Sequence, residues 1–198
     1  MTSVIPRLKH AAPIAALSFL AVLAVSCGAK QETQQAEDTT SPETTSPAAM
    51  SDANIAAVVV AANTADIKNG EMAASRSKNP AVKAFASQMV ADHNAVNKKA
   101  SDLVAKLKVT PEDNETSRAL VQNADATRED LGSRQGVDFD KAYVANEVAY
   151  HQAVLDMIDR ALIPNATNAE LKSLLESVKP AFQAHLSHAQ QLQASLGT

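Results

Sequence analysis

From Ser51 onward, apolar residues recur every three or four positions, which is the spacing of one face of an α-helix. Breaks in the pattern divide this region into five segments. The predicted helices run from Ser51 to a link at Ser77–Asn79, from Pro80 to Val109, from about Asn114 to Leu131, from Val137 or Asp138 to Pro164, and from Thr167 or Asn168 to Leu196. Pro180 lies inside the last segment and is expected to kink it.

The four longer helices form two hairpins with short links, at Ser77–Asn79 and at Ile163–Thr167. About thirty residues with a short helix of their own join the hairpins. This order predicts an all-α, ferritin-like four-helix bundle with one long crossover. The alternative is a plain up-and-down bundle with the fifth helix packed outside. Aromatic residues make up only 3% of the chain and there are five Gly, which favours helices over sheets.

The N-terminal region has the pattern of an export signal. Arg7 and Lys9 precede an apolar stretch, 11–25, that is too short for a comfortable membrane span. Small residues then lead into Cys27, the only cysteine of the chain. This arrangement resembles the lipobox of bacterial lipoproteins, in which the cysteine is diacylated after cleavage. The alternative is an ordinary secretory signal with an incidental cysteine.

The chain therefore divides into a signal peptide (1–26), an acylated Cys27 with a disordered tether (27–50) and a helical domain (51–198). We expect a lipid-anchored protein of the bacterial envelope that faces the periplasm. Gly28, rather than Asp, follows the cysteine and slightly favours the outer membrane. The net charge of -4 and the lack of a basic stripe disfavour nucleic acid as a partner. The membrane is the expected partner, with a protein of the envelope as a further one.

Each long helix carries a polar residue at a core position near its middle, namely Asp66, His93, His151 and His185. A polar group in a bundle core costs a few kcal/mol, about 2 or more, unless it finds a partner. The four residues therefore predict either one transition metal ion (Zn, Cu or Fe) or a metal-free hydrogen-bond network. Secondary candidates for metal binding lie nearby on the same helices: Glu147, His188, Asp92 and Tyr143. The Glu-x-x-His pairs of di-iron bundles are absent, which disfavours a di-iron oxidase.

The pattern leads to further expectations about individual residues. Glu147 and Asp140 are expected on a solvated helix face, Tyr143 and Tyr150 at the margin of the bundle, and Met89 in the core. Counting from the links at about 1.5 Å per residue places His151 and His185 more than one turn apart in height.

Several local strings resemble a known family: Asp66–Gly70 (DIKNG), Asn79–Ala86 (NPAVKAFA), Met89–His93 (MVADH), Phe139–Tyr143 (FDKAY), His151, and Pro180 followed by His185-Leu186. Over Ser51 to Leu196 the chain is similar to the bacterial envelope family called domain of unknown function 4142, which is placed in the ferritin-like superfamily. The resemblance implies the bundle and marks three histidines, His93, His151 and His185, as family-typical polar positions. At Asp66 the family usually has Glu.

No motif indicates a reaction. The chain has no Gly-rich phosphate loop and no Gly-x-Ser-x-Gly elbow. The leading hypothesis is a membrane-tethered periplasmic bundle that binds a transition metal in its core. The alternative is a non-enzymatic interaction or structural module whose buried His/Asp network holds no metal.

Overall fold

A computed structural model describes residues 50–197 of the protein, and this part of the chain contains helices and no strands. The helices are α1 (Asp52–Arg76), α2 (Pro80–Leu107), α3 (Glu115–Ser133), α4 (Gly136–Met157), the π-helical turn η1 (Ile158–Leu162), α5 (Ile163–Asn165) and α6 (Ala169–Ser195). The predicted all-α class is confirmed. The expected signal peptide, Cys27 and most of the tether lie outside the described residues. None of the described helices is long and apolar enough to cross a membrane.

Side-chain caps explain why most of these helices begin where they do. Ser51, Asn79, Asn114 and Asn168 precede α1, α2, α3 and α6, and each accepts hydrogen bonds from backbone N–H groups of the following first turn. These groups would otherwise have no partner within the helix. The sequence pattern therefore located the helix starts to within one or two residues.

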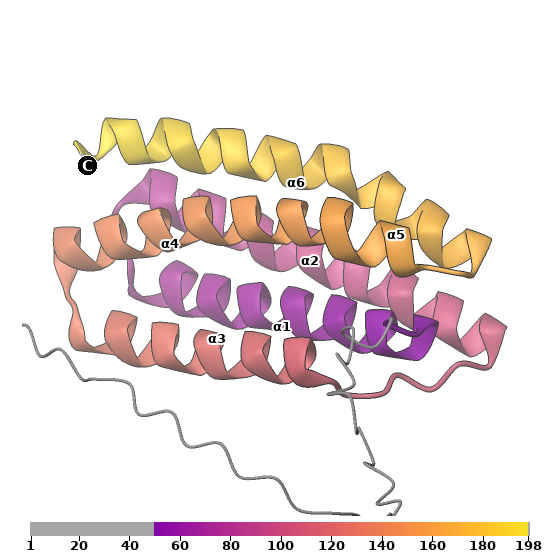
Figure 1. Ribbon diagram of the computed structural model, residues 1–198. Coiled ribbons are helices and arrows are strands. Elements are labelled where there is room, and N and C mark those ends of the chain that lie inside the picture. The colour runs from indigo at the N-terminus through magenta and orange to yellow at the C-terminus, as the bar shows by residue number, and fades with distance from the viewer. Residues whose placement is uncertain (1–49, 198) are drawn as a thin grey trace, which may run out of the picture. The chain divides into compact units, whose positions relative to one another are not determined.

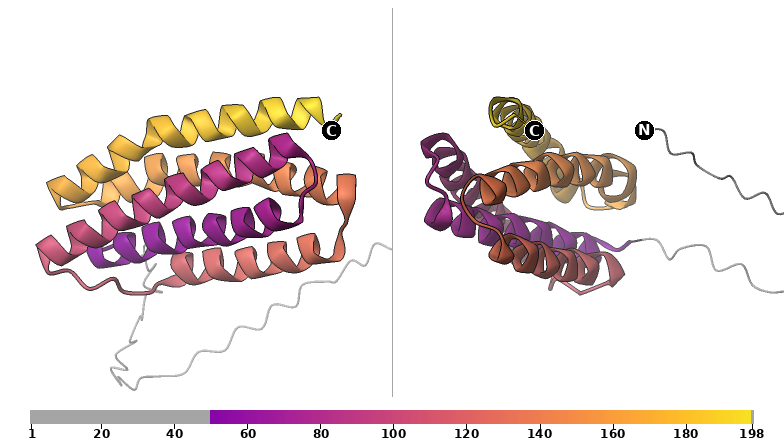
Figure 2. Two further views of the ribbon diagram at one scale, coloured as in Figure 1. Left: turned by 180° about the vertical axis from the view of Figure 1, so that it is seen from behind. Right: turned by 90° about the vertical axis from the view of Figure 1, so that its left-hand side faces the viewer.

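The crossover helix α3 sets the order of the bundle. It packs against α1 and runs back along it, so that α2 and α4 point in the same direction (Figure 1). A plain up-and-down bundle of α1, α2, α4 and α6 would place α2 and α4 antiparallel. Both further views also place α3 beside α1, on the side away from α6 (Figure 2). The predicted long crossover with its own short helix is therefore present.

Two apolar clusters fill the bundle, one toward each end. One is formed by the early part of α1 with the later part of α2, the end of α4 and the beginning of α6. The other is formed by the end of α1, the beginning of α2 and α4, and the end of α6. Every one of the four bundle helices thus passes from one apolar cluster to the other through a middle section, and the buried polar residues lie in that section.

The end of the second hairpin differs from the prediction. Pro164 does not stop the helix, because the backbone widens into the π-helical turn η1, in which the Ile163 N–H bonds the Ile158 carbonyl. A wider turn accommodates a proline ring that would clash with an ordinary helical carbonyl. The helical segment formed by α4, η1 and α5 therefore continues to Asn165. Pro180 lies inside α6, as predicted.

This extension corrects the predicted heights of two histidines. His151 lies 14 residues before Asn165, the end of α5, and His185 lies 16 residues after Ala169, the beginning of α6. At about 1.5 Å per residue the difference is less than one helical turn. The prediction of more than one turn was wrong, because it ended one helix at Pro164 and began the next at Thr167 or Asn168, whereas the helices end at Asn165 and begin at Ala169.

Candidate metal centre

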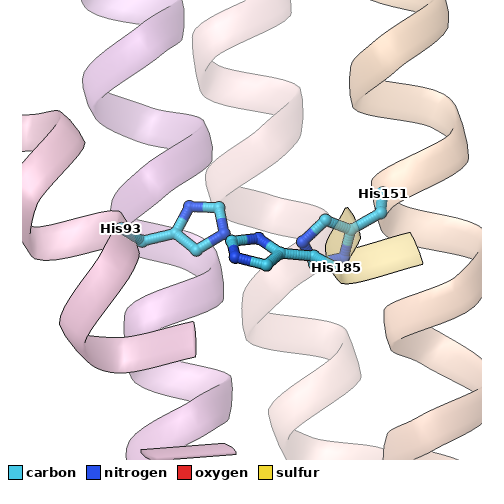
Figure 3. Close-up of side chains that lie close together, drawn as sticks. All are labelled: His93, His151 and His185. Carbon is cyan, nitrogen blue, oxygen red and sulfur yellow. The ribbon is translucent and has the colours of Figure 1, made fainter. Parts of the chain in front are cut away.

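Five buried side chains from all four bundle helices share the section between the two apolar clusters. They are Asp66 on α1, His93 on α2, Glu147 and His151 on α4, and His185 on α6, and none is more than 3% exposed. Figure 3 shows the three imidazole rings pointing toward one another. We call these five residues the polar layer.

The ring of His93 is held on both sides. Its Nδ1 lies 2.7 Å from Asn63 Oδ1, and the Asn63 amide nitrogen in turn donates to the Val59 carbonyl at 2.7 Å. This orientation makes Asn63 Oδ1 an acceptor, so His93 Nδ1 carries a proton. On the other side, His93 Nε2 lies 2.6 Å from Asp66 Oδ2. Two lone pairs would repel at that distance, so one proton lies between these atoms.

The other two rings are each held from one side only. His151 Nδ1 donates to the Glu147 backbone carbonyl at 2.9 Å, one helical turn earlier on α4. His185 Nε2 lies 2.9 Å from Asp92 Oδ2 on α2. Each bond uses the proton of a neutral imidazole, which leaves His151 Nε2 and His185 Nδ1 as bases with free lone pairs.

The distances suit a metal ion. Ring centroids are 5.3 to 5.6 Å apart for the three histidine pairs. One nitrogen from each of His93, His151 and His185 lies within 4.8 Å of the others, and so do ligand atoms of Asp66, Glu147 and His151. Three imidazoles and a carboxylate are a ligand set for Zn, Cu or Fe. Imidazoles fixed by an outer hydrogen bond are typical of metal ligands.

The two carboxyl groups of the layer carry different charges. Burial acts to raise the pKa of Asp66, but the imidazoles of His93 and His151 outweigh it and lower the pKa below its usual range. Burial, together with the nearby Asp66 carboxylate, raises the pKa of Glu147 well above its usual range. Asp66 is therefore the more acidic of the two carboxyl groups and carries the negative charge, while Glu147 keeps its proton to higher pH.

Burial also keeps two of the imidazoles neutral. It lowers the pKa of His151 to about 4, an effect that Asp66 opposes and His93 reinforces. Burial likewise lowers the pKa of His185, although its bond to Asp92 works the other way. The neutral imidazole is the form that binds a metal, so both rings are ready to do so at neutral pH.

Two buried imidazole nitrogens of the layer have no hydrogen-bond partner among the described residues. They are His151 Nε2 and His185 Nδ1, whereas the carboxyl groups of Glu147 and Asp66 lie close enough to share the Glu147 proton. Buried polar atoms in folded proteins are partnered with few exceptions, and each unpartnered one costs roughly 1–3 kcal/mol. Here the two rings come from α4 and α6 and lie 5.3 Å apart between centroids, as imidazoles do around a cation.

The structure corrects three expectations about polar residues. Glu147 and Asp140 do not lie on a solvated face, because both are buried, at 0% and 5% exposure. Tyr143 is not at the margin of the bundle but fully buried in the apolar cluster with Phe85. These positions follow one helical turn from one another along α4, so they share its inward face. The interpretation from charge alone overlooked this spacing.

The remaining candidates lie around the layer. Tyr150 is partly buried and donates to the Ala62 carbonyl at 2.7 Å, while Met89 fills the core as expected. His188 is exposed and packs edge-on against Phe85, outside the layer. Asp92 is the outer partner of His185.

Burial, with smaller effects from Glu147 and Asp66, raises the pKa of Tyr143 well above its usual range. Tyr143 thus lies close enough to the layer for the layer's carboxyl groups to raise its pKa, and its phenol stays neutral.

Two residues that complete the site were not singled out in the sequence. Asn63 orients His93, and Phe182 stacks on the His93 ring at 4.9 Å between centroids. Helical spacing carried a signal for both: Asn63 lies three residues before Asp66, and Phe182 lies three residues before His185.

No curated protein and no solved structure matches the chain. A family model does match it, over residues 37–192, and is described as a domain of unknown function, DUF4142. This range covers most of the 198 residues and the whole polar layer. The chain therefore belongs to the DUF4142 family.

Proposed function

We propose that this protein is a lipid-anchored envelope protein whose helical bundle holds one transition metal ion in the polar layer. The ligands are His93 Nε2, His151 Nε2, His185 Nδ1 and a carboxylate oxygen of Asp66. The observation that carries the proposal is that buried ligand atoms form two overlapping groups, His93/His151/His185 and Asp66/Glu147/His151, and that two of the imidazoles have an unpartnered nitrogen.

The hydrogen bonds favour one ion over two. Each imidazole has one nitrogen bound to an outer acceptor and only one left for a metal. His151 belongs to both groups of ligand atoms, so its single free nitrogen cannot serve two ions at separate places. Glu147 is then not a ligand but a protonated carboxyl group beside the ion that shares its proton with Asp66.

The ligand set favours holding an ion over turning over a substrate. Three nitrogens and one carboxylate complete a tetrahedral site, whereas catalytic zinc sites keep one position for water or substrate. Apolar clusters lie on both sides of the layer along the helices. Storage, sensing or protection of the envelope against a metal fits this arrangement.

A metal-free structural network is the second candidate, and the contacts of His93 favour it. Both nitrogens of that ring have partners without an ion. The same explanation does not extend to His151 and His185, each of which buries a nitrogen without a hydrogen-bond partner. The metal proposal accounts for all three rings.

The location is proposed from the N-terminal sequence. A signal peptide over 1–26, an acylated Cys27 and a polar tether to residue 50 support a bundle held near a membrane and facing the periplasm. The outer membrane is slightly favoured by Gly28.

The proposal is tested by metal analysis of the full chain purified in detergent. After exposure to excess Zn²⁺, Cu²⁺ or Fe²⁺ and removal of free metal, elemental analysis is expected to show about one ion per chain for at least one metal. His151→Gln and His185→Gln should lose that ion. His188→Gln is the matched control, because His188 lies outside the layer, and it should retain the ion. A wild-type chain that keeps none of the metals would overturn the proposal.

A further inference from the structure

The three imidazoles are almost fully buried, so an ion needs a route from solvent to the polar layer. Two surface grooves approach the layer. One, of about 210 Å³, lies between α2 and α6 and is lined in part by Asp92, Phe182 and His185. The other, of about 330 Å³, lies among α1, α3 and α4 and is lined in part by Asn69, Asn146 and Tyr150.

The charges of the two grooves differ. The polar groups that line the α1/α3/α4 groove are amides and hydroxyls, with no charged side chain among its lining residues. The α2/α6 groove is lined by one carboxylate, Asp92, and one ammonium group, Lys99. A carboxylate raises the local concentration of cations, whereas neutral amides do so weakly. The charges of Asp92 and Lys99 offset each other at a distance, but only the α2/α6 groove offers a carboxylate that can bind a cation directly, so it is the better route.

Asp92 connects this groove directly to the layer. Its side chain is 45% exposed, while that of His185, which it contacts at 2.9 Å, is 3% exposed. The His185 ring therefore has one nitrogen, Nε2, toward the half-exposed carboxylate and the other, Nδ1, buried without a partner. No other ring of the layer contacts a carboxylate that is exposed to this degree.

We infer that Asp92 and His185 form the site through which the metal ion enters and leaves the polar layer. This inference rests on the proposed function. A cation in the groove first binds the Asp92 carboxylate. Rotation of the His185 ring about its Cβ–Cγ bond brings the free lone pair of Nδ1 to the ion while Nε2 keeps its proton, and the return rotation carries the Nδ1-bound ion inward. Asp92 acts as a positioning residue for exchange, and Lys99 opposes the approach of cations.

The inference is tested by the rate of Co²⁺ uptake by the full chain in detergent, followed through the visible absorption of the bound ion. Asp92→Asn keeps an acceptor for His185 but removes the charge. Steering by charge changes association rates by about 10-fold or more, so we expect Asp92→Asn to slow uptake by roughly that factor. It should also slow release to a chelator while still binding one ion. Lys99→Ala should accelerate uptake.

Two plugging variants provide a matched comparison. Ala181 and Ala149 are exposed residues that line the α2/α6 and α1/α3/α4 grooves respectively. Ala181→Phe should slow uptake and Ala149→Phe should leave it unchanged. The reverse result, or a wild-type uptake rate for Asp92→Asn, overturns the inference while the metal site itself stands. If the wild-type chain binds no Co²⁺, Zn²⁺, Cu²⁺ or Fe²⁺, the proposed function fails as well.

Discussion

At the scale of single residues, the polar layer depends on hydrogen bonds that approach each ring from outside. Asn63, the Glu147 carbonyl and Asp92 each accept from one imidazole nitrogen and so determine which nitrogen faces inward. Burial then makes the protonation states of the inward groups differ from those in water. The layer therefore affects stability as well as binding, and its pH dependence is measurable.

Glu147→Gln is expected to stabilise the metal-free protein at neutral pH. The raised pKa of Glu147 means that the folded state keeps the proton while the unfolded chain loses it above about pH 4.5. The wild type therefore loses stability as pH rises from there, by up to roughly 1.4 kcal/mol per pH unit, and the glutamine variant does not. Urea unfolding in a chelator at pH 5, 6 and 7 should show a growing advantage for Glu147→Gln. A variant less stable than the wild type at pH 7 would contradict the neutral Glu147.

His151→Gln should change the acid sensitivity of the metal-free protein. The pKa of His151 is lowered from 6.5 to about 4, so the unfolded state takes up a proton first as pH falls through this window. The free energy of unfolding of the wild type therefore falls by up to roughly 1.4 kcal/mol per pH unit from this group, and that of the variant does not. The difference in unfolding free energy between the two proteins should shift toward the variant from pH 7 to pH 4. A constant difference over that range would mean that His151 is not held neutral.

At the scale of elements, the layer requires α1 and α2 to lie close together. Gly70 makes this possible, because an added Cβ would lie 3.0 Å from Val90 Cγ2 and 3.1 Å from the Ala86 carbonyl oxygen. Gly in a helix interior costs about 1 kcal/mol relative to Ala, so the close approach explains its presence. The far end of α1 is held by Arg76, which donates to the Leu131, Gly132 and Arg134 carbonyls where α3 ends.

Gly70→Ala should therefore destabilise the bundle, by about 1–3 kcal/mol, because the Ala86 backbone cannot move away without shifting α2. Gly132→Ala is the control, since a Cβ there would meet only an Arg76 nitrogen at 4.0 Å. That change should be neutral or stabilising by up to about 1 kcal/mol. Chemical denaturation of both variants measures the contrast. Equal effects of the two substitutions would show that α1 and α2 have room for a methyl group at residue 70.

At the scale of the whole molecule, the same chain combines a proposed membrane address with a bundle that has its polar layer at mid-height. The crossover α3 returns the chain along α1, so α4 can supply Glu147 and His151 from the second hairpin. The four bundle helices thus contribute ligands from positions more than a hundred residues apart in sequence. None of the described helices is long and apolar enough to span a membrane.

Cys27→Ser is expected to abolish lipid attachment. Several acyl chains on one cysteine give stable anchoring, at about 0.8 kcal/mol per buried methylene, and serine cannot be acylated in the same way. The wild type should partition into the detergent phase, and the variant should move to the aqueous phase or remain as uncleaved precursor. Mass spectrometry distinguishes these products. A cleaved variant that still enters the detergent phase would contradict the acyl anchor.

The sequence by itself determined the helices, their approximate ends and the crossover, because helical periodicity and capping residues are local properties. It also indicated that Asp66, His93, His151 and His185 face inward. Only the tertiary structure decided that these side chains meet in one layer, since their relative heights depend on where the helices of each hairpin end and begin, which local rules place only to within one or two residues. Only the structure, likewise, showed Glu147 to be buried beside Asp66. The physical reason is that burial and shared protons arise when separate helices pack, whereas one helix alone shows only which residues share a face.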